Sequence, residues 1–151
     1  MLTFQEETYE EFTADGMQLM IDHWEDVALN KDTIDLQPDW LRYKEMYDQG
    51  IAHVVTARTE TNKLVGYAVL LITHNAHYKQ VKFAEGDVYF LQHEYRRGSA
   101  GRRLLQAVED MAKRLGATQF YQKVKLYKDV GVLFERMGYK AIERVYVKDL
   151  V

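Results

Sequence analysis

Apolar residues repeat with two different periods along this chain, and these periods predict both helices and strands. Over residues 17–28 the apolar positions lie three or four apart with acidic residues between them, which is the spacing of an amphipathic helix. Short runs rich in β-branched and aromatic residues are instead typical of strands, and they occupy residues 2–7, 51–59, 64–73 and 83–92. Polar residues 60–63 predict a hairpin turn between two of these strands.

Start and stop signals place the other helices. Pro38 and Asp39 predict a helix start, and Gly50 predicts its end. The clearest helix has an apolar face over residues 104–115 and ends at Gly116.

The remaining pattern predicts a strand over residues 118–125, a short helix over 130–137 and a final strand over 140–150. The order is therefore β-α-α-β-β-β-α-β-α-β, which predicts an α+β fold with a mixed, largely antiparallel sheet flanked by helices. No linker or repeat interrupts the pattern, so we expect a single domain over residues 1–151.

Composition narrows the class of protein. Hydrophobic residues make up 47% and charged residues 28% of the 151 residues, as in globular chains. With no cysteine, the chain has no disulfide, thiolate metal site or cysteine nucleophile. Histidines and acids show no metal-ligand spacing, so we predict no metal. The first residues lack the features of a signal peptide, and the longest uncharged apolar run, residues 67–72, is too short for a bilayer. We expect a cytoplasmic protein without a membrane segment.

Charge is distributed unevenly. Residues 1–50 hold 13 acidic against 3 basic residues, whereas residues 96–151 hold 13 basic against 6 acidic residues. This asymmetry indicates two ligands of opposite charge, although solvated helix faces explain it equally well.

The segment over residues 93–105 carries the most specific chemistry. A strand leads into it, an amphipathic helix leads out, and the turn between them is built from small residues, Gly98, Ser99, Ala100 and Gly101. Free N–H groups at the helix start and a positive dipole end favour a phosphate. Charge that suits a diphosphate comes from Arg96, Arg97, Arg102 and Arg103. The spacing matches neither a P-loop nor a dinucleotide fingerprint. The alternative is an ordinary helix start with arginines nearby by chance.

This turn resembles the central motif of the GNAT N-acetyltransferases, Arg/Gln-x-x-Gly-x-Gly/Ala. Arg96 and Gly101 match its first and last positions, and Ser99 stands where the middle glycine is usual. The run Leu-Phe-Glu-Arg-Met-Gly-Tyr over residues 133–139 is similar to the family's C-terminal signature. The predicted element order matches the family's fold, so the resemblance covers nearly the whole chain. Some small phage-encoded members look similar.

The resemblance implies acetyl-CoA as co-substrate. In the family, pantetheine lies along a splayed strand and the diphosphate rests on the turn. Carried over, this implies contacts with Phe90, Leu91, Gln92, Arg96, Arg97, Gly98, Ser99, Ala100, Gly101 and Arg102.

Acetyl transfer to an amine needs a base and a proton source for the thiolate. Glu85 and Asp87 lie two apart on one strand and so face the same side of the sheet. Glu85 matches the family's usual base best, and Asp87 shares the role or binds the substrate ammonium. His77, in the loop beyond, is a further candidate base. Either carboxylate is otherwise a structural cap or ion-pair partner, and a loop histidine is otherwise simply exposed.

One departure from the family's pattern affects the group that would protonate the leaving thiolate. Phe134 stands at the family's usual proton-donating tyrosine and cannot donate. Tyr127, seven residues earlier, or water would then protonate the thiolate.

In the family the first two helices form one wall of the acceptor site. Here they are acidic, through Asp22, Glu25, Asp26, Asp32, Asp35, Asp39, Glu45 and Asp48. We therefore expect a cationic primary amine, either a small molecule or a protein lysine or N-terminus. The residues expected to line the acceptor site are His77, Tyr78, Trp24 and Tyr43, although aromatics at helical spacing are more often core.

Two other functions stay open. Phe134 leaves room for a catalytically weak acyl-CoA sensor or interaction protein. Aromatic residues between Lys and Arg over residues 121–127 suit single-stranded nucleic acid, and hence a base-modifying acetyltransferase, but the acidic chain makes a poor electrostatic footprint. In the family, pairing through sheets or C-terminal strands also makes a homodimer an expectation.

Overall fold

A computed structural model describes residues 1–28 and 34–151. Its elements are β1 (Thr3–Glu7), α1 (Tyr9–Val27), α2 (Trp40–Asp48), β2 (Ala52–Arg58), β3 (Leu64–Thr73), β4 (Phe83–Leu91), the 3₁₀ turn η1 (His93–Tyr95), α3 (Ala100–Arg114), β5 (Gln119–Tyr121) and α4 (Gly131–Arg136).

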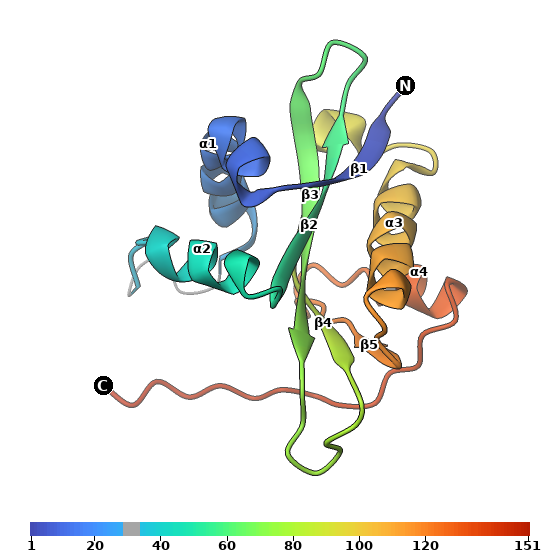
Figure 1. Cartoon of the computed structure of the whole chain (residues 1–151). Coiled ribbons are helices and arrows are strands. Elements are labelled where there is room, and N and C mark those ends of the chain that lie inside the picture. Colours follow the sequence, from blue (N-terminus) through green and yellow to red (C-terminus); the bar gives the residue numbers. More distant parts are fainter. Residues whose placement is uncertain (29–33) are drawn as a thin grey trace.

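The strands form one sheet in the order β1-β2-β3-β4-β5. The first four strands pair antiparallel, and β5 pairs parallel to β4. Helices α1 and α2 lie on one face of the sheet, while α3 and α4 lie on the other (Figure 1). The predicted α+β class and mixed, largely antiparallel sheet are confirmed, and the element order matches as far as α4.

Local capping chemistry starts the helices on the first face. Thr8 and Glu11 form a capping box at the start of α1, in which the Thr8 hydroxyl accepts from the Glu11 N–H and the Glu11 carboxylate accepts from the Thr8 N–H. The Asp39 carboxylate accepts from the Arg42 N–H at 2.9 Å and caps α2, as predicted. Gly50 ends this helix with a φ of 71°, a conformation that glycine adopts without strain.

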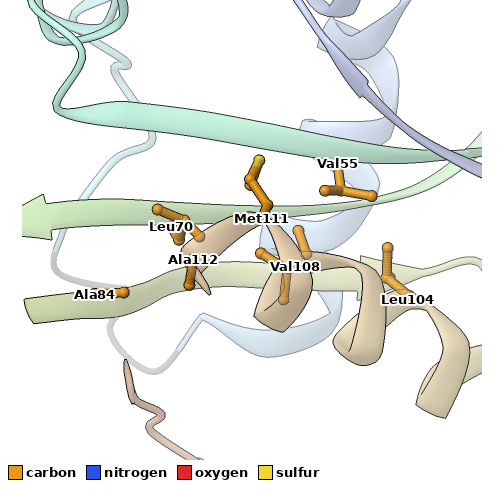
Figure 2. Packing of buried hydrophobic residues seen from close by; sticks show 8 residues of the cluster. Val55, Leu70, Ala84, Leu104, Val108, Met111 and Ala112 are labelled. Carbon is orange, nitrogen blue, oxygen red and sulfur yellow. The ribbon is translucent and has the colours of Figure 1, made fainter. Parts of the chain in front are cut away.

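The α3 face of the sheet is packed by apolar side chains alone. Leu104, Val108 and Met111 on α3 rest on Val55 and Leu70 of the sheet. Figure 2 shows these residues interlocking between the helix and the strands. Met111 is fully buried, so the predicted apolar face of this helix is confirmed.

The α1 face contains the polar core. Within residues 1–28 and 34–151, the buried polar or charged residues are His23, Thr56 and Arg58, and all three lie on this face or on α1. Arg58 is 5% exposed and forms ion pairs with Glu7 at 2.6 Å and with Asp15 at 2.8 Å. These pairs join β1, α1 and β2.

Two predicted strands require correction. The strand expected over residues 118–125 is formed only by Gln119–Tyr121, because the chain turns away from β4 beyond that point. The final strand expected over residues 140–150 is absent: this segment has no partner strand and its side chains are exposed.

Candidate active site

The short strand β5 pairs only with the beginning of β4, and the chain then separates from β4 in a splay. This splay defines the centre of the candidate site. Phe83, Ala84 and Glu85 of β4 face Gln119, Phe120 and Tyr121 of β5. Beyond this point the edge of β4 has no strand beside it, while its other edge stays paired with β3 as far as Leu91. The backbone of β4 therefore presents unpaired hydrogen-bonding groups toward the opening.

Gly86 lies at the apex of this opening, in contact with Gln122. A Cβ atom on Gly86 would lie 2.0 Å from the Gln122 side-chain oxygen, so only glycine allows the amide to sit there. Gln122 was not singled out from the sequence, since a lone glutamine after a short strand carries no motif.

A β-bulge follows immediately in β4. Gly86 pairs with Leu70 and Val88 pairs with Val69, so Asp87 is the extra residue without a partner on β3. A bulge frees a backbone position and redirects a side chain, and bulges are over-represented next to active sites. An isolated glycine inside a strand, here Gly86, is typical of a bulge, but this signal was not used in the prediction.

Asp87 faces three tyrosines of the α1 and α2 side. Burial, and after it the negative charge of Asp87, raises the pKa of Tyr43. Tyr47 has a raised pKa for the same two causes. Burial, then Tyr43 and then the charge of Asp87 raise the pKa of Tyr67. Tyr43, one of the residues expected at the acceptor site, therefore lies within the electrostatic influence of Asp87, and so do Tyr47 and Tyr67.

Asp87 is exposed to solvent at the bulge, although protein groups surround part of its side chain. Desolvation raises the pKa of Asp87, the nearby Lys123 opposes this, and the charge of Glu85 adds to it. Glu85 lies 3.9 Å from the Lys123 ammonium. The two carboxylates are therefore close enough to interact, and the pKa of Asp87 is raised.

The turn before α3 has the form expected of an anion site. Gly98 has a φ of 59°, and a Cβ atom on Gly98 or Gly101 would meet nothing within 4 Å. Among the hydrogen bonds of the described residues, none uses the N–H of Ser99, Gly101 or Arg102. These N–H groups have no hydrogen-bond partner among the described residues, and they lie at the start of the 15-residue helix α3.

The arginines around the turn differ in what they contact. The Arg96 guanidinium donates to Asp26 at 2.9 Å, stacks over the Phe90 ring at 5.3 Å and donates to the Leu91 carbonyl. Arg97 donates to the Glu94 carbonyl at 2.9 Å. The exposed Arg102 forms no ion pair with any other described residue. Arg96 therefore fixes the end of β4 onto α1, whereas Arg102 is available to a ligand.

Gln92 follows β4 and has a buried amide oxygen without a hydrogen-bond partner among the described residues. Its backbone N–H donates to the Val65 carbonyl at 2.8 Å. An unsatisfied buried acceptor next to the splay suits a ligand that carries amide N–H groups, and pantetheine is one. The residues present thus fit acetyl-CoA.

The predicted hydroxyl donor Tyr127 has a different partner. Its hydroxyl donates to the Val27 carbonyl at the end of α1. Lys128, the next residue, pairs with Asp26 at 2.6 Å. The loop that contains Tyr127 is therefore fastened to α1 by both residues.

His77 and Tyr78 lie beyond the far end of the β3–β4 hairpin. The Tyr78 ring packs against Phe83 at 6.2 Å, and His77 contacts Tyr78 at 6.4 Å. Among the described residues, no hydrogen bond, ion pair or ring contact joins His77 to Glu85 or Asp87.

Trp24 is half-buried on α1, and no contact within the described residues joins its side chain to Asp87. Its neighbour His23 is buried instead, with Nδ1 at 2.6 Å from the Tyr67 hydroxyl and its ring stacked on Phe90 at 4.7 Å. Burial lowers the pKa of His23 to about 4. His23 is thus a neutral core residue.

Phe134 is buried with its ring edge-on to Tyr89 at 5.8 Å. The Tyr89 hydroxyl donates to the Lys123 carbonyl at 3.3 Å, and burial raises the pKa of Tyr89 to about 12. Tyr89 therefore places a hydroxyl beside the position where the family has its tyrosine. This hydroxyl was not predicted from the sequence, because Tyr89 lies on β4 and not on the last helix.

Several acids of the first two helices already have partners. Asp26 pairs with Arg96 and Lys128, Asp39 caps α2, and Asp48 pairs with Lys44 at 2.9 Å. Asp32 lies outside the described residues. Among the described residues, the carboxylate whose charge acts on Tyr43, Tyr47 and Tyr67 is that of Asp87 on the sheet.

No described helix is both long enough and apolar enough to cross a membrane. Residues 1–28 and 34–151 contain no group of three potential metal-binding side chains.

Comparison with known proteins agrees with this geometry. The model of the acetyltransferase (GNAT) family matches residues 6–139, so the chain belongs to the GNAT family, whose members use acetyl-CoA as acyl donor. No curated protein is significantly similar in sequence.

Solved structures share the fold at low sequence identity. One is a ribosomal-protein-alanine N-acetyltransferase from Brucella melitensis biovar Abortus 2308, with 16% identity, 100% of both chains covered and a TM-score of 0.74. A glucosamine-6-phosphate N-acetyltransferase from Arabidopsis thaliana has 12% identity, a TM-score of 0.75 and covers 100% of this chain and 99% of its own. An aminoglycoside acetyltransferase from an uncultured soil metagenomic sample, in complex with sisomicin, has 16% identity, a TM-score of 0.73 and coverages of 99% and 95%.

Proposed function

We propose that this protein transfers an acetyl group from acetyl-CoA to a cationic primary amine. The observation that carries the proposal is the alignment along β4 of three features: an unpaired edge beyond Glu85, a bulge at Asp87 and an open turn at Gly98–Gly101. The unpaired edge suits pantetheine, and the open turn suits a diphosphate. The bulge places the Asp87 carboxylate near Glu85 and near the cluster of tyrosines.

The residues around Asp87 suit the acceptor. A primary ammonium is attracted to the Asp87 and Glu85 carboxylates, and the faces of Tyr43 and Tyr47 add a favourable environment for a cation. Because the raised pKa of Asp87 gives it more basicity than an ordinary aspartate, Asp87 removes the proton that makes the amine nucleophilic, directly or through water.

The chemical step then balances as follows. The neutral amine nitrogen forms a bond to the thioester carbonyl carbon, the carbon–sulfur bond breaks, and CoA leaves as a thiolate. The thiolate takes a proton from the Tyr89 hydroxyl or from water, and the second proton of the acylated nitrogen passes through water to that donor. Asp87 then releases the proton that it took from the ammonium to solvent. Tyr89 is proposed here in place of Phe134, whose ring it contacts.

Cofactor binding and catalysis are tested separately. Calorimetry should show micromolar binding of acetyl-CoA to the wild type and none to Gly101→Glu, which places a negative charge at the turn. Gly101→Ala is the matched control and should still bind, because its Cβ atom enters open space. If the wild type does not bind acetyl-CoA, the turn is an ordinary helix start and the proposed function is wrong.

An amine screen by thiol release then tests the acceptor. We expect turnover with polyamines, aminoglycosides or lysine-bearing peptides, and none with neutral or acidic amines. Turnover only with neutral or acidic amines would contradict the cationic acceptor. Acetyl-CoA binding without thiol release for any amine would instead indicate an acyl-CoA sensor.

A further inference from the structure

Lys123 brings a primary amine of the chain itself into the candidate site. It follows Gln122, whose side chain contacts Gly86 at the apex of the splay. The Lys123 ammonium lies 3.9 Å from the Glu85 carboxylate, which is within ion-pair distance but too far for a hydrogen bond. The Lys123 side chain is 68% exposed, so an acyl group can reach its nitrogen and water can exchange its protons.

This ammonium lies on the face of the sheet that α1 covers. Glu85 pairs with Leu71 across β4 and β3, and cross-strand partners point to the same face. Leu71 packs against the apolar cluster that contains Phe12 and Leu19 of α1. The Lys123 amine therefore meets the splay from the same face as the external amine of the proposed function.

The backbone of Lys123 is fixed from the opposite face. Its carbonyl accepts from the Tyr89 hydroxyl at 3.3 Å, and the Tyr89 ring meets Phe134 of α4 at 5.8 Å. Helices α1 and α4 cover opposite faces of the sheet (Figure 1). An acyl donor that lies along the open edge of β4 consequently has the Lys123 amine on one side and the Tyr89 hydroxyl, the proposed proton donor, on the other.

Other lysines are held away from these groups. Carboxylates hold the ammonium groups of Lys44, Lys113 and Lys128 at 2.9, 2.9 and 2.6 Å. Among the described lysines, Lys123 is the one whose charge acts on Asp87, the proposed base. A nucleophile, a base and a proton donor thus meet around residue 123.

We propose that the protein acetylates its own Lys123. This inference rests on the proposed function, since it uses the same acyl donor and the same base. Asp87 takes a proton from the ammonium, the neutral nitrogen bonds to the thioester carbonyl carbon, the carbon–sulfur bond breaks and CoA leaves as a thiolate. Tyr89 or water protonates the thiolate, and the second proton of the acylated nitrogen passes through water to that donor. Asp87 then releases its proton to solvent.

Tethering makes this reaction independent of an added acceptor. An amine attached to the site has an effective concentration on the order of millimolar, so it does not have to be captured from solution. The product is an amide, which is neutral and no longer nucleophilic. Each chain therefore forms one acetyl-lysine and one CoA thiol, and the reaction stops there.

Thiol release without any acceptor amine gives the first test, because the chain has no cysteine and a thiol reagent therefore detects CoA alone. Wild type with excess acetyl-CoA should release one thiol per chain, and mass spectrometry should find one acetyl group, on Lys123. Lys123→Arg keeps the positive charge and should release none, with an unchanged circular dichroism spectrum. Lys125→Arg is the matched control from the same loop and should behave as wild type, since no contact among the described residues joins Lys125 to either carboxylate.

The rate separates this reaction from chemical acetylation and from transfer between copies. The first-order rate constant should not depend on protein concentration, and Asp87→Asn should lower it by about 10²-fold or more. A rate constant that rises with protein concentration, or acetylation of Lys125 as fast as of Lys123, would overturn the proposal. A wild type that acetylates an added amine and leaves Lys123 unmodified overturns self-acetylation alone, whereas a wild type that does not bind acetyl-CoA overturns the proposed function as well.

Discussion

The two faces of the sheet are built on different principles. The α3 face is covered by aliphatic side chains such as Leu70 and Met111. The α1 face includes buried His23, Thr56 and Arg58, and next to them the tyrosines that face Asp87. An apolar face gains stability from burial alone, whereas a polar face depends on complete pairing of its groups. Under the proposed function, α3 supports the turn that binds the acyl donor, while the α1 face provides the polar groups near the acceptor.

The largest expected effect comes from Arg58→Met. This change leaves the buried Glu7 carboxylate without its cation, which costs about 3–5 kcal/mol of unfolding free energy. Met111→Leu on the other face is the control and should cost less than about 1.5 kcal/mol. Urea denaturation measures both. The deficit of Arg58→Met should shrink at acidic pH, where Glu7 is protonated. A deficit that stays the same at acidic pH would show that lost packing is its cause.

Next in size is the loss of activity in Asp87→Asn. Removing a general base typically lowers kcat by about 10²–10⁴-fold, while acetyl-CoA binding should not change. The raised pKa of Asp87 means that the folded protein binds its proton more tightly than the unfolded chain, so this group makes folding less favourable as pH rises through the shifted pKa. Asp87→Asn should therefore lose activity and raise Tm at pH 7. If kcat of Asp87→Asn is unchanged and still falls at acidic pH as in the wild type, Asp87 is not the base and Glu85 is the remaining carboxylate candidate.

His23 gives a smaller, pH-dependent effect. Because burial lowers its pKa from 6.5 to about 4, the stability that neutral His23 provides is present above pH 6.5 and is lost as pH falls toward 4. Unfolding free energy should drop by about 2 kcal/mol between pH 7 and pH 5. His23→Gln, which cannot ionise, should flatten this dependence. An equal drop in the variant would assign the effect to other groups.

The smallest effect is expected from Tyr89→Phe. Water can also protonate a thiolate, so kcat should fall by about tenfold and acetyl-CoA affinity should be retained. The matched variant Tyr127→Phe should leave the chemical step nearly unchanged, since no ring contact among the described residues places Tyr127 beside Phe134, as one does for Tyr89. A larger loss of kcat in Tyr127→Phe than in Tyr89→Phe would reverse this assignment.

Elements with strong local signals could be predicted from the sequence. Pro38, Asp39 and Gly50 bound α2 by their own backbone and side-chain chemistry, and the turn at Gly98 depends on residues that are neighbours in sequence. The spacing of Glu85 and Asp87 likewise placed both carboxylates near one another. These features are local, so no tertiary information was needed.

Features that depend on distant partners could not be predicted. The bulge at Asp87 exists only in the register between β3 and β4. The engagement of Arg96 by Asp26 joins residues 70 positions apart, and nothing near Arg96 in the sequence indicates it. The strand over residues 140–150 was expected from its β-branched and aromatic residues. A strand also needs a partner strand, and the sequence does not identify one.

Asp26 also has a consequence for the order of folding. Its carboxylate contacts Arg96 and Lys128 at once, so the end of α1, the turn before α3 and the loop before α4 meet at a single side chain. Contacts between such remote positions close large loops, and loop closure carries an entropic cost. These ion pairs therefore form after the sheet and its helices have assembled. A probe placed at Asp26 would report the last stage of folding, when the donor and acceptor halves of the site become one.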